Sequence, residues 1–160
     1  MTSSVPGSAA IPANPAGRLS RFATGTALGL VIEAALGIGL NLYVSVPSSP
    51  SYAQVFVSIP LLTVHILLGF LLVVATGVFL VLARRSGIPG LTWKAALAFL
   101  FVVVALQEGF SFTFTQNTAF SSGMAVAFVL ALVLELLVVV DLRRHSRSTG
   151  ASSSGNVPTG

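Results

Sequence analysis

The chain has 160 residues, of which 54% are hydrophobic and only 8% are charged, and its mean hydropathy is +0.95. Average soluble domains are roughly 25% charged, so this composition excludes an ordinary soluble domain and indicates that most of the chain lies in lipid. The absence of cysteine excludes disulfides, thiolate nucleophiles and cysteine-ligated metal centres. The formal charge of +4 does not indicate nucleic-acid binding, because the basic residues gather at the ends of the apolar segments.

Residues 1–19 are predicted to form a disordered tail. They are rich in Pro, Ser, Ala and Gly and have no periodic apolar face with which to offset the entropy of ordering. The first predicted membrane span follows at about 22–44. Its apolar core is longer than the roughly 7–15 residues of a signal peptide, so we expect this span to be retained as an anchor.

Three further apolar segments of spanning length are predicted at about 60–83, 91–114 and 120–142. At ~1.5 Å per residue, each is long enough to cross a hydrocarbon core of ~30 Å as a helix. The end of the third span has two alternatives, because residues 110–115, FSFTFT, alternate apolar and polar side chains. An extended interfacial segment would leave Glu108 near the headgroups, whereas a continuing helix would place it inside the bilayer.

The distribution of the basic residues predicts the orientation. They lie only near the N-terminus, between the second and third spans, and after the fourth span, at Arg18, Arg21, Arg84, Arg85, Lys94, Arg143, Arg144 and Arg147. Because Lys and Arg favour the cytoplasmic side, both termini are predicted to be cytoplasmic. Short connections then predict an all-α, integral membrane four-helix bundle over residues 20–142 with up-down-up-down order, followed by a basic and then flexible tail over 143–160.

Small residues recur at every fourth position within the spans and predict close helix packing. In the first span the same stripe contains Glu33 and Asn41, so we expect it to face other helices rather than lipid. The small residues predicted to serve packing are Gly25, Gly29, Gly37, Gly69, Gly77, Gly123, Ala127 and Ala131.

Polar side chains inside the bilayer are candidates for a proton or cation path, because an ionisable group near its centre costs ~3 kcal/mol or more. The alternative is structural, with protonated Glu33 and Glu135 holding helices together and His65 binding a backbone carbonyl or a serine. We expect Glu33 near the midplane and Glu135 in the inner third, at the level of Thr26 and Thr76. A pocket in the outer leaflet is expected to collect four other candidates, Asn41, His65, Gln107 and Glu108.

Cofactor chemistry has little support in the sequence. His65 is the only predicted intramembrane histidine, which excludes bis-histidine haem, but Met124 lies at a similar predicted depth and leaves a b-type haem on these two residues as an alternative. No metal site is predicted, because His65 with Glu108 and Asn41 supplies too few strong ligands for zinc. No nucleotide-binding, hydrolase or metalloprotease motif is present, so no enzyme is predicted.

Three short motifs, NLYV at 41–44, HILLG at 65–69 and SSGM at 121–124, resemble small, uncharacterised four-span bacterial integral membrane proteins over residues 20–142. The resemblance implies a location in the cytoplasmic (inner) membrane and no particular activity. We expect a non-enzymatic accessory or structural subunit whose partners are the lipid bilayer and other membrane subunits. Two alternatives remain: a proton- or cation-coupled translocation element using Glu33, His65 and Glu108, and a haem-binding electron carrier.

Overall fold

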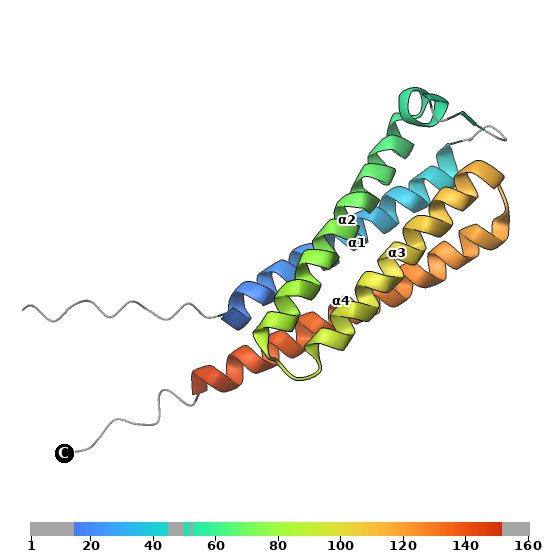
Figure 1. Ribbon diagram of the computed structural model, residues 1–160. Coiled ribbons are helices and arrows are strands. Elements are labelled where there is room, and N and C mark those ends of the chain that lie inside the picture. The colour runs from blue at the N-terminus through green and yellow to red at the C-terminus, as the bar shows by residue number, and fades with distance from the viewer. Residues whose placement is uncertain (1–14, 45–49, 52, 152–160) are drawn as a thin grey trace, which may run out of the picture.

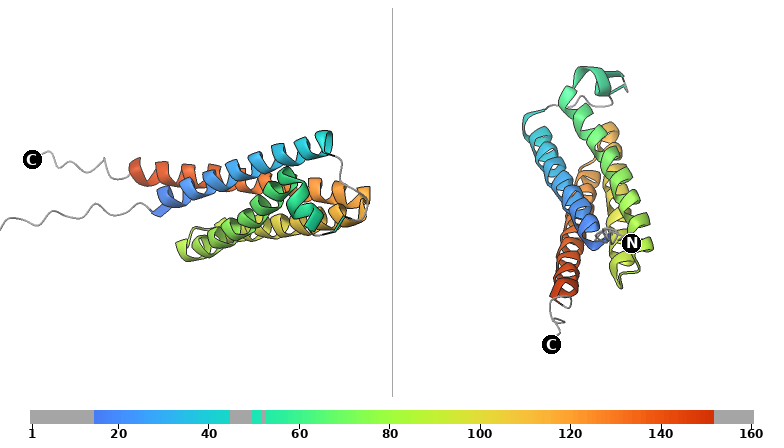
Figure 2. Two further views of the ribbon diagram at one scale, coloured as in Figure 1. Left: turned by 90° about the horizontal axis from the view of Figure 1, so that it is seen from above. Right: turned by 90° about the vertical axis from the view of Figure 1, so that its left-hand side faces the viewer.

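The computed structural model describes residues 15–44, 50–51 and 53–151, and these residues are almost entirely helical. The long helices are α1 (Pro15–Tyr43), α2 (Pro60–Ser86), α3 (Leu91–Thr115) and α4 (Thr118–Ala151), and a short π-helix, η1 (Gln54–Ser58), precedes α2. Successive long helices run in opposite directions, so they form an up-down-up-down bundle (Figure 1). The start of α1, the α2–α3 turn and the end of α4 lie at the same end of this bundle (Figures 1 and 2).

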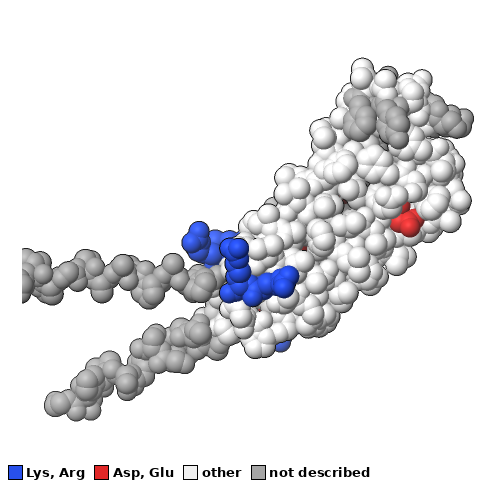
Figure 3. Space-filling view, viewed as in Figure 1, with Lys and Arg blue, Asp and Glu red and all other residues white. Residues whose placement is uncertain are grey.

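The outer surface of the bundle is apolar. Each of the four long helices is long and apolar enough to cross a membrane, and exposed Leu, Val and Ile side chains cover their outward faces. A water-soluble bundle would carry charged side chains there. The positive charges instead gather near the two chain termini (Figure 3). We call this the basic end, defined by Arg18, Arg21, Arg84, Arg85, Lys94, Arg143, Arg144 and Arg147. The opposite end, where α3 turns into α4, is the far end.

Two helices extend beyond the spans expected from the sequence. α1 begins at Pro15, within the tail expected to be disordered over 1–19, because proline suits the first turn of a helix and Leu19 gains burial against Phe79. α4 continues past Leu142 to Ala151, since no proline interrupts it, so part of the expected tail over 143–160 is helical. Residues 1–14 and 152–160 of the expected tails lie outside the described residues.

α3 continues as a helix through Thr115, which corresponds to the helical alternative for the FSFTFT segment. Its hydroxyl groups are satisfied within the helix: Ser111, Thr113 and Thr115 each donate to the carbonyl oxygen four residues earlier, over 2.7–3.0 Å. The helix ends at Gln116, which has a φ of 55°, and Asn117 then caps α4 by accepting a hydrogen bond from the Ala119 N–H.

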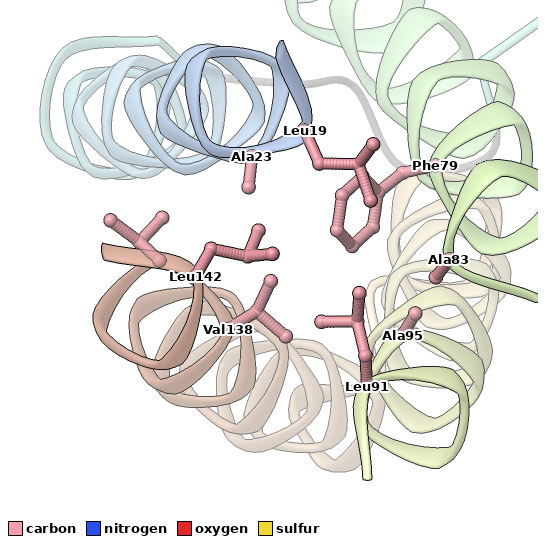
Figure 4. Close-up of a cluster of buried hydrophobic side chains, with 9 residues drawn as sticks. Leu19, Ala23, Phe79, Ala83, Leu91, Ala95, Val138 and Leu142 are labelled. Atoms are coloured by element: carbon pink, nitrogen blue, oxygen red, sulfur yellow. The ribbon is translucent and has the colours of Figure 1, made fainter. Parts of the chain in front are cut away.

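Buried side chains form three layers along the bundle. The first, near the basic end, receives residues from all four long helices (Figure 4): Leu19, Ala23, Phe79, Ala83, Leu91, Ala95, Val138, Val139 and Leu142. The second contains one buried residue from each helix, namely Leu30, Leu72, Val102 and Ala131. The third is built from α1, η1 and α2, with two phenylalanines of α3 packed against it: Leu40, Val55, Leu62, Ile66, Phe110 and Phe114. Among the described residues, α4 contributes no side chain to this third layer.

The small residues of α1 differ in what they face. Residues four apart on a helix are rotated by about 40° from one another, so a stripe with this spacing winds slowly around the helix. A Cβ added at Gly29 would lie 2.9 Å from Leu72 Cδ2 of α2, whereas one added at Gly25 would meet no neighbouring atom within 4 Å. Gly25 is exposed, so it departs from the packing expected of it because the stripe has turned outward there.

Elsewhere the small residues do lie at helix contacts. An added Cβ would come within 3.0–3.3 Å of a side chain on a neighbouring helix at Gly37, Gly69, Gly77 and Gly123. Ala127 and Ala131 are buried. Small side chains at these positions therefore set the distance between neighbouring helices.

The Gly29→Ile substitution should destabilise the bundle, because the added side chain would press on Leu72 in the second layer. Overpacking of this kind costs ~1–3 kcal/mol, which should lower the thermal unfolding temperature of the detergent-solubilised protein by several degrees. Circular dichroism measures this temperature. Gly25→Ile is the matched control, since it makes the same change at an open position and should unfold like the wild type. Equal unfolding temperatures for the two variants would contradict the packing described here.

Candidate functional site

Glu33 of α1 and His65 of α2 meet inside the bundle. Glu33 Oε1 lies 3.0 Å from His65 Nδ1, and Glu33 is only 5% exposed. This contact joins the carboxylate expected at the midplane to the imidazole expected nearer the far end. It differs from the structural alternative in which His65 binds a backbone carbonyl or a serine.

A glycine on each helix makes room for the side chain from the other. Gly69 lies one turn after His65, and a Cβ added to it would be 3.3 Å from Glu33 Oε1. Gly37 lies one turn after Glu33, and a Cβ added to it would be 3.3 Å from His65 Cε1. The arrangement is reciprocal, because each helix presents its polar residue to the glycine of its partner. Small residues at these two positions thus allow the pair to form.

The hydrogen bonding of this pair is incomplete. Glu33 Oε2 is buried and has no hydrogen-bond partner among the described residues. The close contact of His65 Nδ1 with Oε1 lacks the direction of a hydrogen bond. Buried polar atoms are normally satisfied, and an unsatisfied one costs free energy. One carboxylate oxygen of the pair therefore remains without a partner inside the bundle.

A cavity of about 670 Å³ extends from this pair toward the far end. All four long helices line it, with Glu33 and Gly37 from α1, His65 from α2, Thr113 from α3 and Phe128 from α4 among the lining residues. It lies at the level of the third layer of the core, to which α4 contributes no side chain among the described residues. The cavity thus occupies space that a fourth set of core side chains would otherwise fill.

The mouth of the cavity faces sideways, between α1 and α4. The exposed lining residues are Ile38 and Asn41 on α1 and Ala125 and Val129 on α4. The lining residues of α2 and α3 are all buried or half-buried. Because the outer faces of α1 and α4 are apolar, this mouth opens on the surface that would contact acyl chains if the bundle lies in a membrane.

The pocket expected from the sequence forms only in part. His65 lines the cavity and Asn41 lies at its mouth, but Gln107 and Glu108 do not line it. On α3 the cavity face is set by Ala105, Gly109 and Thr113, at spacing four, and the two polar residues fall on other faces of the helix. Glu108 instead crosses toward α4, where a Cβ added to Gly123 would be 3.0 Å from its Oε2.

The two candidate haem ligands line the same cavity from opposite helices. Met124, on α4, packs against α3, because a Cβ added to Gly109 would lie 3.0 Å from its Sδ. The sulfur therefore contributes to the α3–α4 contact. No cluster of three or more His, Cys, Asp or Glu side chains suited to a metal ion occurs in the part of the chain that the structure describes.

One ion pair was not expected from the sequence. Lys94, at the start of α3, forms a hydrogen-bonded ion pair with Asp141 of α4 at the basic end. The Lys94 ammonium also lies 5.7 Å from the ring centre of Trp93. In the sequence, Asp141 lies two residues before Arg143, and Lys94 lies close to the start of the third predicted span. Lys94 thus pairs with Asp141, and not with the deeper Glu135.

Glu135 is buried between the first and second layers of the core. It is 1% exposed, and neither carboxyl oxygen has a hydrogen-bond partner among the described residues. Thr26 and Thr76, expected at this depth, are also buried, but their hydroxyls donate to carbonyl oxygens of their own helices. Glu135 therefore lies apart from the cavity, in a closed part of the bundle.

Glu135→Met should stabilise the protein, because methionine has a similar volume and removes two buried oxygens that lack partners. A buried unsatisfied polar group costs ~1–3 kcal/mol, so the thermal unfolding temperature in detergent should rise by a few degrees. Glu135→Ala should lower that temperature, since it leaves a void. A lower unfolding temperature for Glu135→Met would instead indicate that a protonated Glu135 holds two helices together.

Comparisons with protein-family models, with curated proteins and with solved structures gave no match to this chain. The function must therefore be inferred from the chemistry of the residues themselves. The Glu33–His65 pair and the cavity beside it are the features on which such an inference can rest.

Proposed function

We propose that the protein is an integral protein of the cytoplasmic membrane that crosses it four times, with both termini in the cytoplasm. Four helices of spanning length with apolar outer faces support the membrane location. The eight basic residues at one end support the orientation, because Lys and Arg favour the cytoplasmic side of a membrane. The turn between α3 and α4, at the far end, contains only the uncharged Gln116 and Asn117.

Single introduced thiols can test this orientation, because the chain has no cysteine. Arg84→Cys and Arg143→Cys should react with a membrane-impermeant maleimide only after the membrane is opened. Asn117→Cys, at the far end, should react in intact cells. Reaction of the first two thiols from opposite sides of the membrane would contradict the proposed orientation.

We infer that the protein is a non-enzymatic accessory subunit of a membrane complex, in which Glu33 and His65 exchange a proton or a cation. The observation that carries this inference is the buried, incompletely hydrogen-bonded contact between a carboxylate and an imidazole beside a cavity. Both groups can bind and release a proton, and at a separation of 3.0 Å a turn of the imidazole that aligns a hydrogen bond would let a proton shift between them. Ionisable groups within a membrane commonly mark such pathways.

Access to the pair is one-sided. The cavity lies on the far-end side of the pair and opens between α1 and α4, whereas the second layer, Leu30, Leu72, Val102 and Ala131, closes the bundle toward the basic end. A complete path across the membrane therefore needs elements beyond this chain, which favours a subunit over a self-sufficient channel. Glu108 has no part in the path, because it does not line the cavity.

Glu33→Gln should abolish proton or cation flux, because glutamine keeps the shape of the side chain but cannot bind and release a proton. The measurement is the response of a pH-sensitive dye in proteoliposomes that contain the protein with the partner recovered by gentle solubilisation. Glu108→Gln is the matched control, since it makes the same chemical change outside the cavity and should retain wild-type flux.

Two results would count against the proposal. Equal flux in Glu33→Gln and wild type would remove Glu33 from the pathway. A homomer that is fully active without a stoichiometric partner would contradict the accessory role.

A further inference from the structure

We propose that the cavity binds a lipid-soluble phenol or hydroquinone, whose uncharged polar ring lies at Glu33 and His65 and whose hydrocarbon tail leaves between α1 and α4. The volume of about 670 Å³ falls within the range of about 300–1,000 Å³ that small-molecule sites occupy. The inference rests on the membrane location proposed above. It does not require that the pair move protons across the membrane.

The polar groups in the depth of the cavity suit a ring that carries oxygens. Glu33 lines the cavity and is 5% exposed, and its Oε2 is buried without a hydrogen-bond partner among the described residues. The imidazole of His65 lies beside it and can donate to a carbonyl or accept from a hydroxyl. A phenol or hydroquinone hydroxyl can donate to the carboxylate oxygen without bringing another charge into the bundle.

The walls suit a flat ring. Phe110 and Phe112 of α3 and Phe128 of α4 line the cavity, and aromatic side chains pack favourably against a ring face or edge. Most other lining residues are aliphatic, so the remaining surface excludes water from the ring. This combination of few polar groups and an apolar wall is typical of small-molecule sites.

The position of the mouth suits a ligand that arrives from lipid. Ile38 and Val129 border it and are 62% and 58% exposed. A tail that leaves between them would contact acyl chains, with no need to pass through the far end of the bundle. A ligand dissolved in water would have to cross the lipid-facing surface to reach the same mouth.

Native mass spectrometry of the full protein ejected from lipid nanodiscs tests this proposal, with 4-decylphenol as the probe. We expect one probe molecule per chain. Glu33→Leu should weaken binding about tenfold, as expected for the loss of one hydrogen bond. Decylbenzene has the same tail and ring but no oxygens, and it should bind at least about tenfold more weakly for the same reason.

Variants at the mouth test the route of entry. Ala125→Trp and Val129→Trp should reduce occupancy by the probe about tenfold, because a bulky side chain would narrow the mouth. Ala35→Trp is the matched control, since Ala35 is exposed on α1 but does not line the cavity, and its occupancy should equal that of the wild type. The unfolding temperatures of these variants confirm that they are folded.

Several outcomes would overturn the proposal. One is equal occupancy in the wild type and both mouth variants, and another is equal occupancy by 4-decylphenol and decylbenzene. A phospholipid that occupies the cavity and resists displacement by the probe would also overturn it. So would a Soret band that is lost in His65→Ala, which would assign the cavity to haem. Loss of binding in Ala125→Trp with normal proton flux would separate this site from the proposed proton exchange.

Discussion

The contact between Glu33 and His65 depends on the close approach of α1 and α2. It explains why each of these helices has a glycine one turn after its polar residue. A carboxylate cannot be satisfied by lipid, so it needs a polar partner from another helix. His65 provides that partner only because Gly37 and Gly69 leave space for the two side chains. The four residues therefore form one packing unit, in which each polar side chain occupies the space beside a glycine of the other helix.

The cavity is a consequence of incomplete packing at the same level. In the first two layers every long helix contributes a buried side chain, and the bundle is closed. In the third layer η1 packs on α2 through Val55, and the Thr63 hydroxyl donates to the Val55 carbonyl, while α4 contributes no side chain among the described residues. A folded bundle normally fills such space, because unfilled apolar volume costs stability. The proposed ligand would fill this space, which lies beside a carboxylate with an unpartnered oxygen.

Much of this architecture could be predicted from the sequence, but the rotation of each helix could not. Long apolar segments predicted four helices, and the spacing of Glu33 with Gly37 and of His65 with Gly69 predicted that these residues lie at helix contacts. Gly25 belongs to the same stripe yet faces outward, because the stripe turns by about 40° at each step. Glu108 and Gln107 were assigned by depth alone, and depth does not determine which face of α3 is buried. In residues 110–115 the alternation of apolar and polar side chains allowed either an extended segment or a helix. The segment is helical, and its hydroxyl groups donate to carbonyl oxygens within α3.

The two buried carboxylates of the bundle differ in access, and this difference decides which of them can act. Glu135 has no partner for either oxygen, but it is enclosed between two closed layers, so neither an ion nor a ligand can reach it without movement of the helices. Glu33 has one oxygen in contact with His65 and the other without a partner, and the residue lines the cavity. Exchange of a proton or binding of a ligand requires access as well as a free polar atom. Only Glu33, among the described residues, combines a buried unsatisfied carboxylate oxygen with a cavity that reaches the surface.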